Sequence, residues 1–193
     1  MEDWLNKVTY GNLSKYHLDI LKRKCLADDV IPILDKTYGS QLDFPLNNSE
    51  SVKQELNEMV EKVRSIFDES NAEHLARYKR YDRNLMQSIL SAFTVKGMDV
   101  AEIYNSINED IAPTIIKLKQ KYQRPRPFQL AQYYKLKLFP YDTFSGHSPS
   151  YPSGHTIQAY VILNIIGNKY PQSYGFCKQF ITDIADSRVY LGL

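Results

Sequence analysis

The sequence contains few of the residues that identify metal-binding, disulfide-linked or secreted proteins. Of its 193 residues, only two are cysteine and four are histidine. Neither Cys25 nor Cys177 has another cysteine or histidine at the spacing of metal ligands, so a zinc site is not expected. Two free thiols are typical of a reducing compartment, although a disulfide between the two stays open. The first residues, MEDWLNKVTYGN, lack the basic start and apolar run of a secretory signal peptide.

A strong excess of one charge and long apolar runs are also missing. The 24 basic and 22 acidic side chains nearly cancel, which argues against a general attraction to nucleic acid. No apolar stretch approaches the ~20 residues that a helix needs to span a bilayer. The sequence therefore predicts a soluble, cytoplasmic chain with no membrane span and no nucleic-acid partner.

The hydrophobic residues are present in helical patterns. They make up 43% of the chain, enough for one core, and the length fits a single domain over residues 1–193. Their spacing follows the 3.6-residue period, and alternating strand patterns are nearly absent, so we predict an all-α fold. Residues 32–48 and 128–154 are expected to be irregular. The expected helices span residues 12–31, 49–67, 72–93, 100–118, 155–167 and 176–193.

Three short segments carry possible chemistry, and the first lies where the 100–118 helix ends. Pro113 is expected to kink or restart this helix. Lys119 is followed seven residues later by Arg126 and then Pro127. Seven residues are about two helical turns, so the spacing starts along one helix face, and the prolines should place Arg126 just beyond the helix. Taken alone, the segment is also typical of solvated bases near the negative end of a helix dipole.

The second segment is PSGH at residues 152–155, directly before an expected helix. Ser153 is a natural N-cap, and the free N–H groups behind it form an anion site that Gly154 leaves open to close approach. His155 is suited to donate a proton to a leaving oxygen. Taken alone, the segment is also typical of a capped helix with an incidental histidine. A first SGH at 145–147 lacks the proline and the helix, so we expect it to be a bystander.

The third segment is Ser187 followed by Arg188, within the last expected helix. An arginine between apolar neighbours on a helix is ordinarily a surface residue whose stem covers apolar surface. Alone, it predicts nothing more specific.

In order and spacing, the three segments together resemble the signature of one superfamily. That signature reads K-x6-R-P, then P-S-G-H, then S-R-x5-H, and it joins class A acid phosphatases, type-2 phosphatidic acid phosphatases and vanadium haloperoxidases. The first two parts are complete here, and the third is complete up to Leu193. The resemblance covers residues 100–193, and the stretches KYQRPRPF and SYPSGHT look most like the soluble class A acid phosphatases. It implies a helical bundle of the acid phosphatase type.

The resemblance also implies a role for each matching residue. His155 would be the general acid that protonates the leaving alkoxide. The phosphoryl oxygens would be held by five residues, Lys119, Arg126, Ser153, Gly154 and Arg188. Because a phosphomonoester carries about −1.5 to −2 charges at pH 7, three cations are a sensible match and no metal or cofactor is expected. The partner would be a small phosphate ester, and homo-oligomers are common in the family.

The nucleophile of the family is the histidine that closes the third motif and forms a phosphohistidine, which water then hydrolyses. Here that histidine would be residue 194, so we expect that the domain continues and that its C-terminal end is cut off in this sequence. Three other functions stay open. They are a haloperoxidase in which the cradle holds vanadate, a lipid phosphatase, and a non-catalytic phosphate-binding module if Leu193 is the true terminus.

The residues before position 100 contain no recognisable motif. We expect them to supply helices that wall the pocket and set specificity. His17 and His74 lie in this part of the chain, and both are expected at the surface. His147, in the first SGH, is the rival of His155 and is the less favoured of the two.

Overall fold

The computed structural model describes residues 3–22 and 43–193, apart from the side chains of 106–110. Every regular element in these ranges is a helix, which confirms the predicted all-α class. The α-helices are α1 (Lys15–Leu21), α3 (Glu50–Ile66), α4 (Ala72–Arg83), α5 (Leu85–Thr94), α6 (Ala101–Tyr122), α7 (Pro127–Ala131), α8 (Gly154–Lys169) and α9 (Tyr174–Tyr190). Short 3-10 helices lie at Asp3–Lys7 (η1), Glu69–Asn71 (η3), Phe144–Gly146 (η4) and Pro171–Ser173 (η5).

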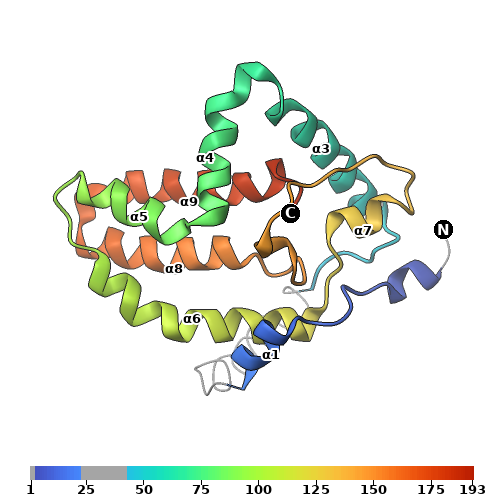
Figure 1. The fold of residues 1–193 in the computed structure, drawn as a ribbon, viewed down its shortest axis with the longest axis horizontal. Coiled ribbons are helices and arrows are strands. Elements are labelled where there is room, and N and C mark those ends of the chain that lie inside the picture. Colours follow the sequence, from blue (N-terminus) through green and yellow to red (C-terminus); the bar gives the residue numbers. More distant parts are fainter. Residues whose placement is uncertain (1–2, 23–42) are drawn as a thin grey trace.

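The direction of three long helices decides where the three motif segments come together. Helices α8 and α9 form an antiparallel pair joined by η5, and α6 packs along the other side of α8 (Figure 1). Helices α6 and α9 run in one direction and α8 runs in the other. The C-terminal ends of α6 and α9 therefore lie at the same end of the molecule as the N-terminus of α8.

Two hydrophobic clusters hold this arrangement. The larger joins α4, α5, α6, α8 and α9, and Phe93, Ile162 and Ile184 in it are fully buried. The smaller lies beneath α3 and α7 and includes Leu56 and Leu130. Burial of each such side chain stabilises the fold by roughly 1.5–3 kcal/mol, so the clusters fix the helix ends on which the site depends.

Helix α3 begins where its sequence predicts. The Ser49 hydroxyl accepts a hydrogen bond from the Val52 amide at 3.2 Å, as expected of an N-cap. Leu56 and Met59 are buried as predicted, but Phe67 at the C-terminal end is exposed and Ile66 takes the buried position. The hydrophobic face of the helix is therefore predicted correctly except at its last residue.

The expected helix over residues 72–93 is wrong in its continuity. It is two helices, because Asn84 takes a non-helical conformation and caps α5 by accepting a hydrogen bond from the Gln87 amide at 3.1 Å. Of the two outcomes expected at Pro113, a restart does not occur, since α6 continues through this residue. The break at Asn84 matters for the site because it places Asp82 at the end of α4.

Helix α1 is much shorter than the helix expected over residues 12–31. Ser14 caps its first turn. It buries His17 and Ile20, whereas Leu18, expected on the apolar face, is 45% exposed. The rest of the predicted helix, with Cys25, lies outside the described residues. Cys177 is buried in the larger cluster.

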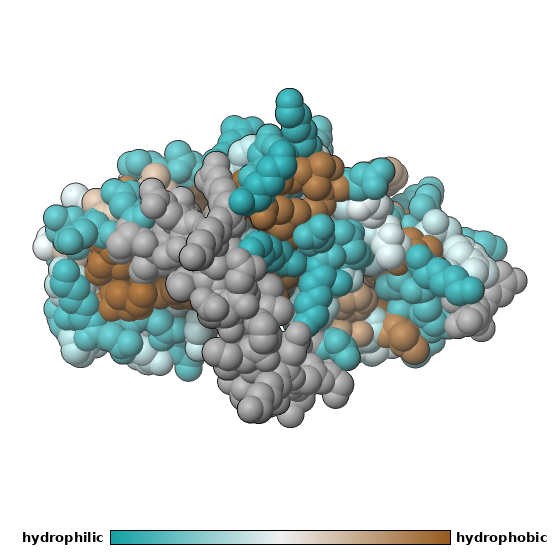
Figure 2. All heavy atoms as spheres, turned by 90° about the horizontal axis from the view of Figure 1, so that it is seen from below, coloured by the Kyte–Doolittle hydropathy of each residue, from teal (hydrophilic) through white to brown (hydrophobic). Residues whose placement is uncertain are grey.

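The face that carries α1 and α6 is mostly hydrophilic where its residues are described, and its hydrophobic residues form separate patches (Figure 2). Among the described residues, no helix combines the length and the apolar composition needed to cross a membrane.

Candidate functional site: a cationic cavity at the meeting of four helix ends

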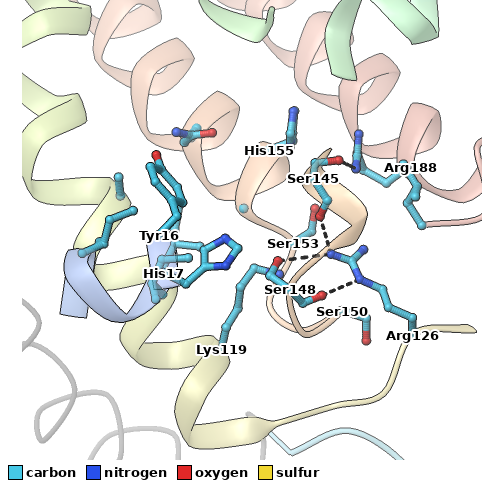
Figure 3. A pocket seen from close by; sticks show the side chains of 17 residues that line it. Tyr16, His17, Lys119, Arg126, Ser145, Ser148, Ser150, Ser153, His155 and Arg188 are labelled. Atoms are coloured by element: carbon cyan, nitrogen blue, oxygen red, sulfur yellow. Dashed lines mark hydrogen bonds between the residues drawn. The ribbon is translucent and has the colours of Figure 1, made fainter. Parts of the chain in front are cut away.

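A cavity of about 230 Å³ lies at the end of the molecule where α6, α8 and α9 meet. The structure brings to its wall all the residues that the motifs single out (Figure 3). They are Lys119, Arg126, Ser153, Gly154, His155 and Arg188. Residues from three different helices and one connecting segment therefore line one space, although up to 69 positions separate them in sequence, from Lys119 to Arg188.

The three cations of the cavity are buried. Lys119 is 5% exposed, Arg126 is 4% exposed and Arg188 is 6% exposed. Lys119 and Arg126 are therefore not solvated bases at the end of a helix, and Arg188 is not a surface residue. A buried charge requires hydrogen-bonding partners or an opposite charge, so the groups around each cation explain how the site is built.

Carbonyl oxygens of one loop hold Lys119 and Arg126. The Arg126 guanidinium donates from Nε to the Ser148 carbonyl at 2.6 Å and from Nη2 to the Ser145 carbonyl at 2.6 Å. The Lys119 ammonium donates to the Pro149 carbonyl. Because these acceptors are uncharged, they orient the two cations and leave their positive charges unbalanced.

The same loop is tied to the segment that carries Arg126. The Ser150 amide donates to the Arg124 carbonyl at 3.0 Å, and the Ser150 hydroxyl donates to the Pro125 carbonyl at 2.8 Å. The prolines at 125 and 127 remove backbone donors here, and Pro127 starts α7 with Arg126 as its N-cap residue. Hydrogen bonds therefore join the two backbone segments that surround Lys119 and Arg126, the loop of residues 145–150 and the segment of residues 124–126.

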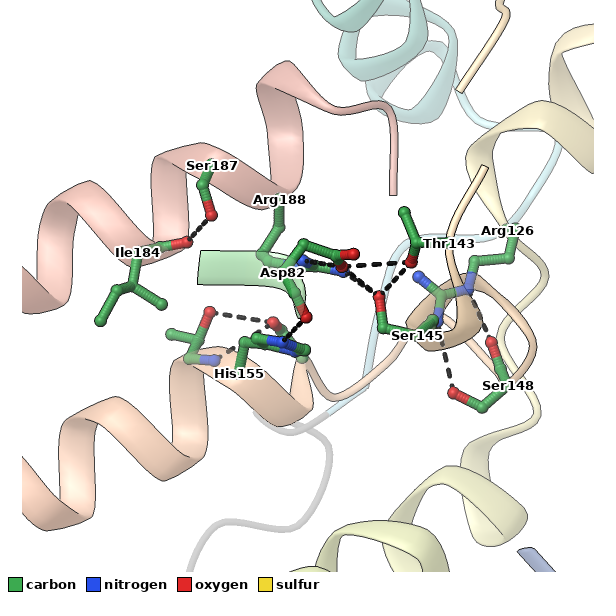
Figure 4. Close-up of polar contacts among 11 residues, drawn as sticks. Asp82, Arg126, Thr143, Ser145, Ser148, His155, Ile184, Ser187 and Arg188 are labelled. Carbon is green, nitrogen blue, oxygen red and sulfur yellow. Dashed lines mark hydrogen bonds and ion pairs between the residues drawn. The ribbon is translucent and has the colours of Figure 1, made fainter. Parts of the chain in front are cut away.

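Arg188 has a charged partner that the motifs do not predict. Its Nη1 lies 2.7 Å from Asp82 Oδ1, and both side chains are at most 7% exposed (Figure 4). Its Nη2 lies 2.7 Å from the Ser145 hydroxyl, which donates to the same carboxylate. Thr143 also donates to Asp82 Oδ1, at 3.1 Å. The carboxylate at the end of α4 thus fixes both Arg188 and the loop.

The electrostatics of the cavity are those of an anion site. Burial, together with the nearby charges of Arg126 and Arg188, lowers the pKa of Lys119 well below its ordinary value. Burial and the charge of Arg188 lower the pKa of Arg126 to about 10. The pKa of Arg188 is also lowered by burial, against the opposing effect of Asp82. Mutual repulsion among cations is relieved by an anion placed between them.

His155 lies at the first turn of α8 with its Nε2 3.2 Å from the Asp82 carbonyl oxygen. Burial and the charge of Arg188 lower its pKa to about 4, against the opposing effect of the Asp82 carboxylate. With only these groups around it, the imidazole is therefore neutral at pH 7. An anion bound in the cavity would raise this pKa and return the proton that a general acid needs.

Ser153 and Gly154 have the structural roles expected at the start of a helix. The Ser153 hydroxyl accepts from the Thr156 amide at 3.4 Å and from the Thr156 hydroxyl at 2.9 Å, which confirms the predicted N-cap. A Cβ at Gly154 would lie 3.3 Å from Ile115 Cγ2. The glycine therefore also allows α8 to start close against α6, in addition to opening the backbone to the cavity.

Three residues of the cavity region correct the sequence interpretation. His17, expected at the surface, is 5% exposed and lines the cavity. Ser145, in the SGH expected to be a bystander, also lines it, whereas His147 of the same triplet is exposed and directed to Asp142. Asp82, which pairs with Arg188, lies outside all three motifs. His74 is exposed, as predicted.

The sequence contains few signals that would assign Asp82 and His17 to the site. Asp82 lies in the charged stretch KRYDR, which is ordinary for a helix surface, and only the helix break at Asn84 marks its position. His17 has Ser14 three residues before it, a helix-start signal that predicts α1 but not what α1 packs against. In the ranges that the structure describes, no group of three or more histidine, cysteine or acidic residues comes together as a metal site.

No family model, no curated protein and no solved structure matches the chain.

Proposed function

We propose that the cavity binds the phosphoryl group of a phosphomonoester and that the protein is a metal-independent phosphatase of the acid phosphatase type. One observation carries this proposal. Three buried cations and a histidine at a helix N-terminus line one cavity, none of its described lining residues is acidic, and the Asp82 carboxylate pairs with Arg188. Such a concentration of buried positive charge destabilises a protein unless a bound anion compensates it.

The charges match the proposed substrate. Among the described residues, Lys119, Arg126 and Arg188 contribute three positive charges and Asp82, the partner of Arg188, one negative charge, which gives this group a net charge of +2 when all four are ionised. A phosphomonoester carries about −1.5 to −2 at pH 7. Arginine forks suit two oxygens each, and lysine adds a compact charge. The cations thus supply the charge neutralisation that other phosphatases obtain from metal ions.

His155 supports the proton transfer of the proposed reaction. As the bond from phosphorus to the ester oxygen breaks, the leaving alkoxide takes the proton from the imidazolium, which becomes neutral. In the superfamily that the motifs resemble, the attacking histidine closes the third motif, which this sequence matches from Ser187 to Leu193, and Leu193 lines the cavity. Attack from there forms a bond between nitrogen and phosphorus, and water later hydrolyses the phosphohistidine.

The test is hydrolysis of 4-nitrophenyl phosphate by the natural protein at full length. The variant His155→Ala should lower kcat by roughly 10²–10⁴-fold, the usual contribution of a general acid. The matched control is His147→Ala, which removes the exposed histidine of the other SGH and should retain activity. A full-length protein that is inactive toward phosphomonoesters, or an active one that loses nothing with His155→Ala, would contradict the proposal.

A further inference from the structure

The cavity has two unlike walls. The cations, Ser153 and His155 form one of them. The other consists of uncharged and mostly apolar side chains from α1 and from the middle of α6, namely Tyr16, His17, Ile20, Ala112, Ile115 and Ile116. Figure 3 shows Tyr16 and His17 across the labelled group from Arg126 and Arg188. A ligand that fills the cavity must therefore be an anion at one end and apolar at the other.

Where α1 contributes to the apolar wall, Tyr16 and His17 belong to a cluster of aromatic rings that also includes Phe144. The Tyr16 and Phe144 ring centroids are 5.6 Å apart in an edge-to-face contact, and the rings of His17 and Phe144 are stacked at 6.2 Å. Tyr16 is 57% exposed and Phe144 is 65% exposed. Two large aromatic rings thus stay open to solvent next to a buried cationic site.

His17 is held as a neutral member of this cluster. Its Nδ1 lies 2.8 Å from the Ser14 hydroxyl, which fixes the ring on α1. Burial, and then the charges of Lys119 and Arg126, lower its pKa. With only these groups around it, the ring is neutral at pH 7 and adds an aromatic surface to the cavity rather than a fourth positive charge.

We propose that the aromatic cluster of Tyr16 and His17, which line the cavity, and Phe144, which packs against both, receives the leaving group of the substrate and selects esters in which that group is an aromatic ring. The inference rests on the proposed function, because it assumes that phosphate occupies the cationic wall. An added ring can continue the edge-to-face packing of Tyr16 and Phe144, which a saturated group of the same size cannot do. The small cavity volume fits one ring better than a large ligand, since sites for drug-sized molecules measure roughly 300–1,000 Å³.

The test measures binding, so that it does not depend on turnover. Calorimetric titration of the natural protein compares inorganic phosphate, methylphosphonate, cyclohexylphosphonate and phenylphosphonate, with each Kd referred to the dianion. Phenylphosphonate should bind about three- to tenfold more tightly than cyclohexylphosphonate, the gain expected from aromatic contacts beyond buried area. Methylphosphonate should be the weakest of the three phosphonates.

Paired variants locate the source of the preference. Tyr16→Ala combined with Phe144→Ala should bring the ratio of the cyclohexyl and phenyl Kd values to about one. The control combines Tyr160→Ala with Phe139→Ala, which removes two similarly exposed aromatic rings that neither line the cavity nor belong to the cluster of Tyr16, His17 and Phe144, and should keep the ratio. Equal binding of phenyl- and cyclohexylphosphonate, or a preference that survives the first pair, overturns this inference alone. Failure of inorganic phosphate to bind overturns the proposed function as well.

Discussion

The buried cations Lys119, Arg126 and Arg188 differ in the groups that bind them. Carbonyl oxygens hold the first two, whereas Arg188 has the carboxylate of Asp82. Carbonyls orient a cation without neutralising it, so two of the three charges remain available to an anion. At the scale of residues, the site therefore contains more positive than negative charge among its described residues, and the loop of residues 145–150 and the Asp82 carboxylate hold these cations in place.

The pKa of His155 predicts a dependence of stability on pH. Because the folded protein holds this pKa at about 4, below the ordinary value near 6.5, the unfolded chain takes up the proton first as the pH falls. The stability associated with neutral His155 is fully present above about pH 6.5 and is lost as the pH falls towards 4, by a total on the order of 3 kcal/mol.

Chemical denaturation at pH 7 and at pH 5 measures this effect as a difference between the natural chain and His155→Gln. The variant should lose less stability than the natural chain on acidification. His17, whose pKa is also lowered, contributes equally to both proteins and cancels in the comparison. Identical losses in the two proteins would show that His155 titrates normally.

The Asp82 carboxylate predicts a defect that phosphate repairs. Asp82→Asn leaves the buried Arg188 without its counter-charge, which should destabilise the protein by about 3–5 kcal/mol. Phosphate bound in the cavity would supply the missing negative charge, so saturating phosphate should raise the Tm of this variant more than that of the natural chain.

The matched control is Asp183→Asn. Asp183 pairs with Arg77 at 3.0 Å and accepts a hydrogen bond from Tyr81 at 2.8 Å, and none of these residues lines the cavity. Its Tm loss should persist in phosphate. Equal rescue of both variants would mean that phosphate acts by a general effect on the folded protein.

At the scale of elements, the site depends on helix ends rather than on helix interiors. Lys119 lies in the last turn of α6, Arg188 in the last turn of α9 and His155 in the first turn of α8. At the turn of the hairpin the two helices approach closely, since a Cβ at Gly167 of α8 would lie only 3.1 Å from the Tyr174 ring at the start of α9. Small changes in how these elements meet should therefore affect the cavity.

The turn after α9 provides a test at this scale. Gly192 has φ of +74° and a Cβ there would lie 3.0 Å from Pro140 Cα, beside the hydrogen bond from the Tyr141 amide to the Leu191 carbonyl. Gly192→Ala should therefore combine backbone strain of about 1–2 kcal/mol with a clash that displaces the loop. The free energy of unfolding, measured in urea, should fall by more than the strain alone.

Gly97→Ala isolates the strain. Gly97 has nearly the same φ, +72°, but nothing lies within 4 Å of an added Cβ. The Gly97 variant should therefore be the less destabilised of the two. Equal losses would indicate that the contact between Gly192 and Pro140 does not restrain the end of α9.

How far the sequence predicts these elements depends on the range of the interactions. The start of α3 at Ser49 and the start of α8 at Ser153 follow from local capping and are confirmed. The helix break at Asn84 is also local, but asparagine occurs within helices as well as at their ends, so the sequence alone does not predict this break. The burial of His17 depends on α6, about 100 residues away, and no local pattern in the sequence carries that information.

At the scale of the molecule, the antiparallel packing of α8 between α6 and α9 is what turns three separate motifs into one site. The residues before position 100 complete the cavity, with Asp82 from α4 on the cationic side and α1 on the apolar side. The expectation that this part of the chain walls the pocket agrees with the structure. Its effect on specificity stays a prediction.

The central claim is that Lys119, Arg126 and Arg188 form one phosphate site, and calorimetric titration with inorganic phosphate tests it most directly. The natural chain should bind phosphate at a single site, and Arg126→Ala should weaken binding by at least about tenfold, the value of one hydrogen bond to a charged group. Arg124→Ala, two residues away and paired with Glu55 at 2.7 Å, should bind as the natural chain does. Absence of binding, or equal loss in the Arg124 and Arg126 variants, would contradict the account.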